Sequence, residues 1–234
     1  MAQRKLVIGD IHGALKALEQ CLSRAGYNPE QDTLICLGDV TDGWPQTREC
    51  IDLLLTLPNL VYIRGNHDEM ALHWARTGET LPEWLTQGGY ATVESYNGKM
   101  PDSHLNLLEN SLLYYELSNT LFVHAGIHTS KPLTKQHKDT FLWDRTLFNM
   151  AFDHRMDKNP PHLTKYDEIY IGHTPIHVYG YKRPLKACEV WMMDTGAGWD
   201  GVLSVMDIMT GECWTSDPVR TLYPEHEGRF KTTG

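Results

Sequence analysis

Five short motifs combine aspartate, histidine or asparagine with glycine, and they follow one another along a chain of 234 residues. They are Gly9-Asp10-Ile11-His12-Gly13, Gly38-Asp39, Gly65-Asn66-His67-Asp68, His124-Ala125-Gly126 and Gly172-His173-Thr174. Carboxylate, imidazole and amide groups in one set suit first-row divalent ions such as Mn, Fe or Zn better than Ca or Mg. The motifs therefore predict a metal site.

The size of this set indicates a pair of ions. A carboxylate can bridge two ions about 3.5 to 4 Å apart, and a water held between them would lose a proton near neutral pH. The same ions would neutralise the oxygens of a phosphoryl group during in-line attack. The predicted chemistry is hydrolysis at phosphorus, with a metal-bridging hydroxide as nucleophile.

Each motif taken alone has an ordinary explanation. The chain contains 12 His, and Gly-Asp or Gly-His pairs also occur in turns, because glycine permits unusual backbone angles and aspartate caps helices. Five such motifs in a fixed order, the first three after apolar runs, favour the metal site.

The first 75 residues alternate between predicted strands and helices, and this alternation positions the first three motifs. Apolar runs ending at Ile8, Leu37 and Ile63 predict buried strands, and helices are expected at about 14–25, about 45–57 with Pro45 in the first turn, and from Asp68. This spacing predicts right-handed crossovers and a largely parallel half-sheet. Ligands following three such strands would lie side by side.

The remaining segments are expected to complete a single domain over 1–234 with a second sheet. Strands are predicted at 113–117 and 120–123, and four further segments are interpreted as antiparallel strands, at 168–171, 190–193, 202–208 and 213–215. Helical pieces at about 77–112 and an irregular segment at about 128–165 are expected as rim or lid segments over the site.

The composition argues against several classes of protein. A formal net charge of -9 disfavours a surface that grips nucleic acid, although a local pair of cations could still attract an anionic substrate. No apolar stretch approaches the roughly 18 residues of a membrane span, and no signal peptide is apparent. The five cysteines lack paired spacing, which fits reduced, buried thiols. These features predict a cytoplasmic protein with neither membrane nor nucleic acid as a partner.

Together the motifs resemble those of the calcineurin-like metallophosphoesterases, specifically the phosphoprotein-phosphatase branch with its bacterial and phage members. The resemblance covers most of the chain and extends to the segment from Trp84 to Tyr96 and to Asp194-Thr195-Gly196-Ala197. It implies an α/β fold, a four-layer αββα sandwich of two mixed β-sheets flanked by helices, with a dinuclear metal centre.

The resemblance also implies a set of metal ligands. One ion would take Asp10 and His12, Asp39 would bridge, and the second ion would take Asn66, His124 and His173.

Other residues would act on the substrate. His67 would be the general acid that protonates the leaving oxygen, oriented by Asp42. Asn66 and Arg145 would bind the substrate phosphate, and a surface salt bridge is the alternative for Arg145.

Three further residues lie near the motifs. Asp194 is expected to hold a histidine ligand or a loop, and Arg64 is expected to bind phosphate or a loop carbonyl. The direction of His177 does not follow from the sequence.

One position departs from the family pattern. The pattern continues after the second aspartate with Arg-Gly, and that arginine binds substrate phosphate, whereas Asp42 is followed by Gly43 and Trp44. The loss of a bidentate guanidinium would weaken charge-assisted binding. Trp44 would either offer a stacking face to a base or pack against the start of the next helix.

The leading prediction is a dinuclear metal-dependent phosphomonoesterase, with Mn as the first choice of metal. Its substrate would be a phosphoprotein, nucleotide or small phosphoester, phosphoserine and phosphothreonine included. Because the arginine is missing, hydrolysis of dinucleoside polyphosphates or other nucleotides is the alternative. A non-catalytic metal-binding scaffold ranks third, since all six ligands and the His67–Asp42 pair are present.

Overall fold

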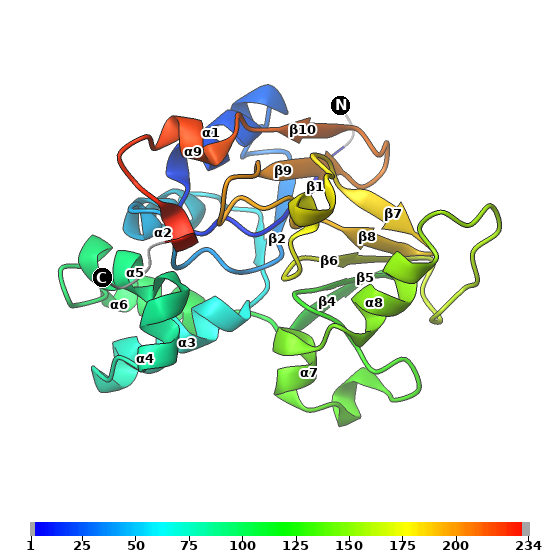
Figure 1. The fold of residues 1–234 in the computed structure, drawn as a ribbon, viewed down its shortest axis with the longest axis horizontal. Helices are drawn as coiled ribbons and strands as arrows, with labels where there is room; N and C mark the ends of the chain where they lie inside the picture. Colours follow the sequence, from blue (N-terminus) through cyan, green and yellow to red (C-terminus); the bar gives the residue numbers. More distant parts are fainter. Residues whose placement is uncertain (1–2, 231–234) are drawn as a thin grey trace.

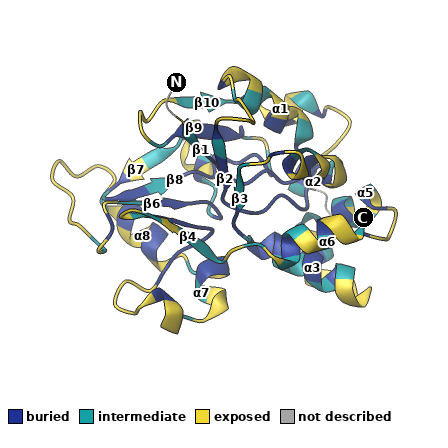
Figure 2. Ribbon diagram, turned by 180° about the vertical axis from the view of Figure 1, so that it is seen from behind, coloured by how far each residue is buried: buried dark blue, intermediate teal, exposed yellow. Residues whose placement is uncertain are grey.

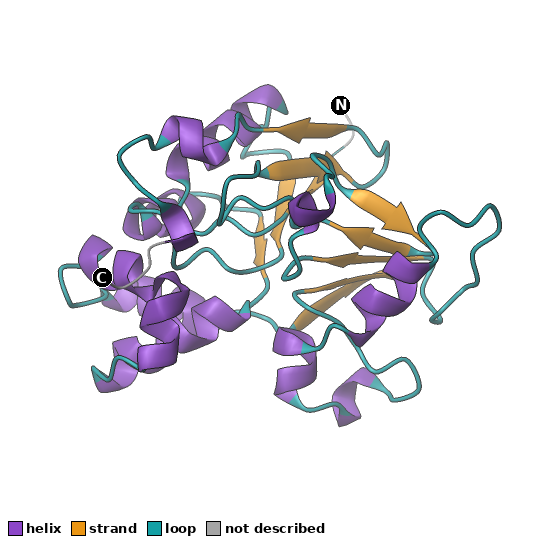
Figure 3. Cartoon of the chain, viewed as in Figure 1, coloured by secondary structure: helices purple, strands orange, loops and turns teal. Residues whose placement is uncertain are grey.

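Two five-stranded β-sheets lie at the centre of the molecule in the computed structural model, which describes residues 3–230 (Figure 1). The strand order is β10-β9-β1-β2-β3 in one sheet and β4-β5-β6-β8-β7 in the other. Helices flank the pair of sheets, giving the αββα sandwich of two mixed sheets (Figure 3). The expected fold class is confirmed.

The first sheet begins with three parallel strands separated by helices, as the apolar pattern predicts. The elements in chain order are β1 (Lys5–Ile8), α1 (Leu15–Arg24), β2 (Thr33–Cys36), α2 (Thr47–Leu55), β3 (Leu60–Tyr62) and α3 (Asn66–Thr77). An antiparallel hairpin of β9 (Ser204–Asp207) and β10 (Cys213–Thr215) extends this sheet beside β1. Pro45 precedes α2 and does not lie in its first turn, contrary to expectation.

The second sheet differs from the prediction in strand direction. Its strands are β4 (Tyr114–Leu117), β5 (Thr120–Val123), β6 (Glu168–Ile171), β7 (Leu185–Ala187) and β8 (Val190–Met192). The antiparallel interpretation is wrong for 168–171, because β6 pairs in parallel with both β5 and β8, and for 190–193 it holds only where β8 pairs with β7. Short apolar strands carry no mark of direction, and the connections of β6 are long enough to return the chain to the same end of the sheet. β7 was not predicted, since this edge strand has no apolar run.

Alternating side chains divide the core into layers. Leu6 and Ile8 of β1 pack with the residues of α1 and α2, whereas Val7 between them packs in the cluster shared by both sheets. In that shared cluster Phe122 and Tyr170 stack with ring centroids 5.0 Å apart. The central strands are accordingly buried, the edge strands β4 and β10 are only partly buried, and the helices expose their outer faces (Figure 2).

Helices occur in both segments that were expected at the rim. Residues 77–112 contain α4 (Pro82–Trp84), the π-helical turn η1 (Leu85–Gly89), α5 (Tyr90–Ser95) and α6 (Asp102–Glu109). Residues 128–165 contain η2 (Leu133–Lys135), α7 (Lys138–Trp143) and α8 (Thr146–Asp153). Short helices η3 (Ile176–Tyr179), α9 (Val219–Leu222) and η4 (Gly228–Phe230) complete the elements. A role of these segments as lids stays a prediction.

Candidate active site

The six predicted ligands lie where parallel strands of both sheets end. Asp10 and His12 follow β1, Asp39 follows β2, and Asn66 begins α3 after β3. His124 and His173 follow β5 and β6 in the second sheet. All six side chains are buried. The sandwich thus brings the ends of two parallel strand sets to one place, as expected for the first sheet and unforeseen for the second.

Two groups of potential ligand atoms share one carboxylate. Oxygen or nitrogen atoms of Asp10, His12 and Asp39 lie within 4.8 Å of one another, and so do those of Asp39, His124 and His173. Asn66 Oδ1 lies 2.9 Å from His124 Nε2 and 2.8 Å from His173 Nδ1. The structure therefore brings the six residues together around Asp39.

Backbone carbonyls hold two of the imidazole rings in place. His12 Nδ1 lies 3.0 Å from the carbonyl oxygen of Thr41, and His124 Nδ1 lies 2.9 Å from that of Leu37. These contacts orient both rings so that their Nε2 atoms face Asp39, at 3.8 Å and 3.4 Å from its Oδ2. Such bonds from the far nitrogen typically fix the orientation of metal-binding histidines.

The donor set fits divalent cations. His173 Nε2 is a buried nitrogen without a hydrogen-bond partner within residues 3–230, a condition that costs free energy unless a ligand meets it. The backbone N–H of His173 donates to Asp10 Oδ2 at 3.0 Å, which places the first and last motifs side by side. Buried carboxylates together with imidazole nitrogens match the chemistry of first-row divalent ions.

Burial and neighbouring charges shift the pKa values of the cluster. Burial raises the pKa of Asp10, and Asp194 raises it further. Burial acts in the same direction on Asp39, but the nearby histidines outweigh it and hold the pKa of that carboxyl well below its usual range. Burial opposes protonation of His124, yet Asp39 raises the pKa of His124 to about 10. The cluster thus stabilises positive charge next to its carboxylates.

The other two imidazoles are shifted the opposite way. Burial lowers the pKa of His12, and the charge of Arg229 lowers it further. Burial also lowers the pKa of His173, followed by the charges of His124 and Arg145. Both rings are neutral donors at neutral pH.

His67 and Asp42 form a buried pair beside this cluster. His67 Nδ1 lies 2.6 Å from Asp42 Oδ2, and the rings of His67 and His12 lie 5.0 Å apart. Asp42 also accepts hydrogen bonds from Trp84 Nε1 and Thr92 Oγ1, each at 2.7 Å. The carboxylate is thereby fixed, and Nε2 is the nitrogen of His67 that remains to meet a substrate.

Trp84 and Thr92 lie in the segment from Trp84 to Tyr96, and the sequence pattern did not predict their contact with Asp42. Both side chains are buried, and both come from the helical segment over α2 and α3. No spacing rule could have assigned them to Asp42, since they lie 42 and 50 residues away.

Asp68 is a third residue whose function the sequence pattern did not predict. Its carboxylate accepts the backbone N–H groups of Asp39, Val40 and Gly65 at 2.9 Å, 3.1 Å and 3.0 Å. Tyr62 Oη donates to the same carboxylate at 2.9 Å. Asp68 thus fastens the loop carrying Asp39 to the start of α3. An acidic residue in the first turn of a helix was the available signal.

The backbone of the site adopts conformations that are rare for residues other than glycine. His12, Asp39, Asp42 and His173 have φ values of 51°, 48°, 72° and 64°. Such angles cost about 1 to 3 kcal/mol each and concentrate at functional sites, where the surrounding structure holds them. Four of the predicted site residues share this property.

The structure decides between the two interpretations of Arg64 and of Trp44. Arg64 donates to the carbonyls of Leu108 and Glu109, so its structural interpretation is confirmed. Trp44 is fully buried, and its Nε1 donates to Ala197 O at 2.6 Å. The interpretation of Trp44 as a stacking face for a base is therefore wrong, because its ring is covered by Tyr223 at 5.3 Å.

Three residues at the edge of the site remain outside the two ligand groups. Asp194 Oδ1 accepts the backbone N–H of Gly196 at 2.9 Å, so it supports a loop. His177 Nε2 lies 3.3 Å from Asp200 Oδ1. Arg145 is exposed at the start of α8, and its charge reaches His173. Contact of Arg145 with phosphate stays a prediction.

Comparison with known proteins identifies the family of this chain. Residues 4–203 match the family model of the calcineurin-like phosphoesterases. Serine/threonine-protein phosphatase 1 of Salmonella typhimurium is 27% identical over 207 residues, covering 86% of this chain and 90% of the relative. A symmetrical bis(5'-nucleosyl)-tetraphosphatase of Pseudomonas syringae is 31% identical over 179 residues, covering 73% of this chain and 59% of the relative.

Solved structures share the fold at low sequence identity. A protein proposed to be a diadenosine tetraphosphatase superposes with a TM-score of 0.66 at 18% identity, covering 92% of this chain and 93% of the other. A metallophosphoesterase from Sphaerobacter thermophilus superposes with a TM-score of 0.59 at 18% identity, covering 92% and 87%. Within residues 3–230, no helix is long and apolar enough to cross a membrane.

Proposed function

This chain belongs to the calcineurin-like phosphoesterase family and is a hydrolytic enzyme, and we propose that it hydrolyses phosphomonoesters at a centre of two divalent cations. The family binds divalent metals. The observation that carries the proposal is the sharing of Asp39 between two buried ligand groups, beside the His67–Asp42 pair. Phosphoserine and phosphothreonine in proteins are the substrates we place first, in keeping with the name of the Salmonella relative.

The residues of the site would divide between two cations. Asp10 and His12 would hold one cation, and Asp39 would contact both. The other cation would be held by Asn66, His124 and His173. Bound cations of this kind supply an acidified water and neutralise charge on phosphoryl oxygens. We place Mn first, with Fe or Zn as alternatives, because the donors are nitrogen and oxygen without sulfur.

The protein itself would supply the proton for the leaving group. His67 would donate from Nε2 to the leaving oxygen, while Asp42 holds Nδ1 and stabilises the protonated ring. Asn66 would orient a phosphoryl oxygen through its amide, and Arg145 would approach from the side of His173. Residues 77–112 and 128–165 would form the rim of the site within one domain.

A second candidate is hydrolysis of dinucleoside polyphosphates. The Pseudomonas relative, named as a tetraphosphatase of that kind, and Gly43 in place of an arginine favour it. The burial of Trp44 weakens it, since that ring cannot stack on a base.

The experiment is a side-by-side assay of the Mn-loaded protein. A phosphopeptide, para-nitrophenyl phosphate and diadenosine tetraphosphate should be compared by kcat/KM, and we expect the two monoesters to be preferred. A preference of about tenfold or more for the dinucleotide would establish the second candidate. No turnover of any of them would favour the non-catalytic scaffold.

We also propose a cytoplasmic location. Cys21, Cys36 and Cys50 are free and buried, and Cys188 and Cys213 are free and partly buried. Free thiols of this kind suit a reducing compartment.

A further inference from the structure

Gly43 lies under a side chain from the other end of the chain. A Cβ atom added to Gly43 would be 3.1 Å from Arg229 Cγ and 3.4 Å from His12 Cβ. Gly43 also has a φ of 91°, which side chains rarely adopt. A side chain at position 43 would therefore strain the backbone and press on Arg229 of η4, whose side chain lies next to His12.

Further glycines lie against the side chain of Arg229. A Cβ on Gly88 would lie 3.3 Å from Arg229 Cγ, and a Cβ on Gly198 would lie 3.0 Å from Arg229 Cδ. The backbone N–H of Arg229 donates to Gly198 O at 3.2 Å, and its Nε donates to Gln87 O at 3.1 Å. Three separate segments of the chain thus leave a channel for the aliphatic part of this side chain.

The residues before Arg229 are anchored on Trp44. A Cβ on Gly228 would lie 2.7 Å from Trp44 Cζ2, so the backbone of η4 runs directly over the indole. Tyr223 stacks on the same indole, and its hydroxyl donates to Gln46 Oε1 at 2.7 Å. The buried Trp44 therefore packs against the C-terminal segment, residues 223–230, and positions it next to the site.

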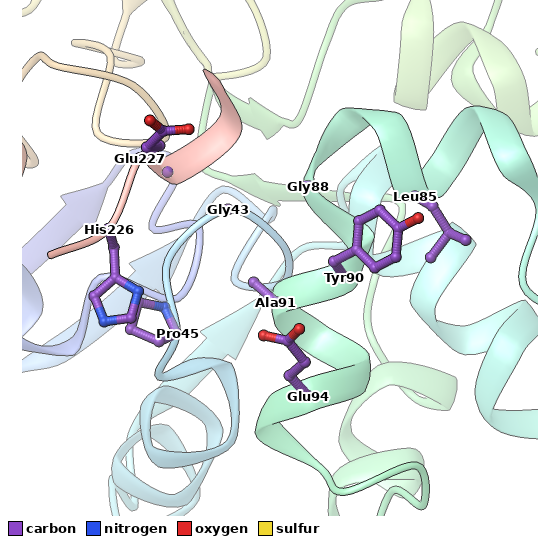
Figure 4. Close-up of a pocket in the computed structure, with 10 residues that line it drawn as sticks. Gly43, Pro45, Leu85, Gly88, Tyr90, Ala91, Glu94, His226 and Glu227 are labelled. Carbon is purple, nitrogen blue, oxygen red and sulfur yellow. The ribbon is translucent and has the colours of Figure 1, made fainter. Parts of the chain in front are cut away.

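The C-terminal segment and α5 both line a pocket. His226 and Glu227 line this pocket from the segment, and Tyr90 and Glu94 line it from α5, with Gly43 between them (Figure 4).

The channel ends at the metal-ligand cluster. Arg229 Nη1 lies 3.4 Å from His12 Nε2, the nitrogen that faces Asp39. The guanidinium lies over the ring of Trp199, with Cζ 4.7 Å from the ring centroid. Its charge also acts on Asp194. A permanent positive charge therefore stands at the edge of the site, on the side of His12.

A purely structural role for Arg229 does not explain the position of its guanidinium. Among residues 3–230, the guanidinium meets a protein carbonyl through Nε, and the partner of Nη1 is a nitrogen that a cation would take. A guanidinium next to such a cation is repelled unless an anion lies between them. A phosphoryl oxygen is the anion that this site is built to receive, and arginine's planar fork of donors matches it.

We propose that Arg229 binds the substrate's phosphoryl group, with its guanidinium brought to the site by the C-terminal segment across Gly43, opposite Arg145. The proposal rests on the proposed function for the identity of the substrate. It accounts for Gly43 as well, since a side chain there would displace Arg229.

The test measures binding of inorganic phosphate to the Mn-loaded protein by calorimetry, alongside kinetics. Arg229→Gln should weaken phosphate binding by about tenfold or more, because a hydrogen bond to a charged group is lost. KM for a phosphomonoester should rise with it, while metal content and Tm stay at their wild-type values. Arg229→Lys should recover part of the binding, since lysine keeps the charge without the fork.

Arg220→Gln is the matched control. Arg220 is exposed on α9, and its replacement changes the net charge by the same amount as Arg229→Gln. Phosphate affinity within twofold of wild type in Arg229→Gln, or equal losses in both variants, would overturn the proposal. So would a wild-type protein that binds no phosphate. A wild type that binds phosphate but turns over no phosphoester would overturn only the proposed function, and the loss in Arg229→Gln would still support Arg229.

Discussion

Replacement of His67 by asparagine should slow hydrolysis most for substrates with poor leaving groups. Asparagine preserves a hydrogen bond to Asp42 but carries no proton that it can transfer near neutral pH. General acid catalysis typically contributes about 10²- to 10⁴-fold, which corresponds to roughly 3 to 5 kcal/mol of barrier. An alkyl phosphate should show a loss of this size, whereas para-nitrophenyl phosphate, whose leaving group departs without protonation, should lose much less.

The structure also predicts that metal binding survives this change. His67 contacts Asp39 through its backbone N–H, which donates to Oδ1 at 2.9 Å and is unaffected by the side chain. The loop carrying Asp39 is held separately by Asp68. Metal content, measured by mass spectrometry, should therefore stay close to wild type.

The assay is the dependence of kcat on leaving-group pKa for a series of aryl and alkyl phosphates, with a steeper slope expected in His67→Asn. His73→Asn is the control, because His73 lies on the same helix with its side chain 42% exposed and pairs with Glu79. Equal losses for good and poor leaving groups would refute the acid role. A large loss of metal would refute the separation between the pair and the ligand cluster.

Two other predictions concern metal loading and stability. Asp39→Asn should abolish activity and weaken loading of both ions, since its carboxylate belongs to both ligand groups; full metal content at a normal rate would contradict this. Asp32→Asn should lower the free energy of unfolding at pH 7 by about 1 to 3 kcal/mol, because the carboxylate accepts charged hydrogen bonds from Arg4 at 2.5 Å and 3.2 Å. Burial acts to raise the pKa of Asp32, but the bonds from Arg4 and Asn28 lower it overall. The contribution is thus complete above the unfolded pKa of about 3.9 and disappears as the pH falls through the lower folded value. Urea unfolding of both proteins at pH 7 and in acid measures it, and a difference that persists in acid would contradict the ion pair.

The sequence by itself determined the parallel half-sheet and the identity of the clustered residues. Apolar runs of strand length alternate with helical periodicity, so Asp10, Asp39 and Asn66 had to emerge at one edge of a sheet. The ligand types then indicated the chemistry, because they follow from residue identity alone. Strand direction in the second sheet was not determined, since residues 168–171 and 190–192 are short, largely buried strands without periodic marks of orientation.

Only the tertiary structure decided what surrounds the chemistry. Trp84 and Thr92 reach Asp42 across 42 and 50 residues, and Arg229 reaches His12 across 217. Local pattern cannot specify such contacts, because they depend on how whole layers pack and not on the residues nearby in the chain. In the sequence, Gly43 shows only that the family's arginine is missing. In the structure, the absence of a side chain at Gly43 leaves space for the side chain of Arg229 beside the site.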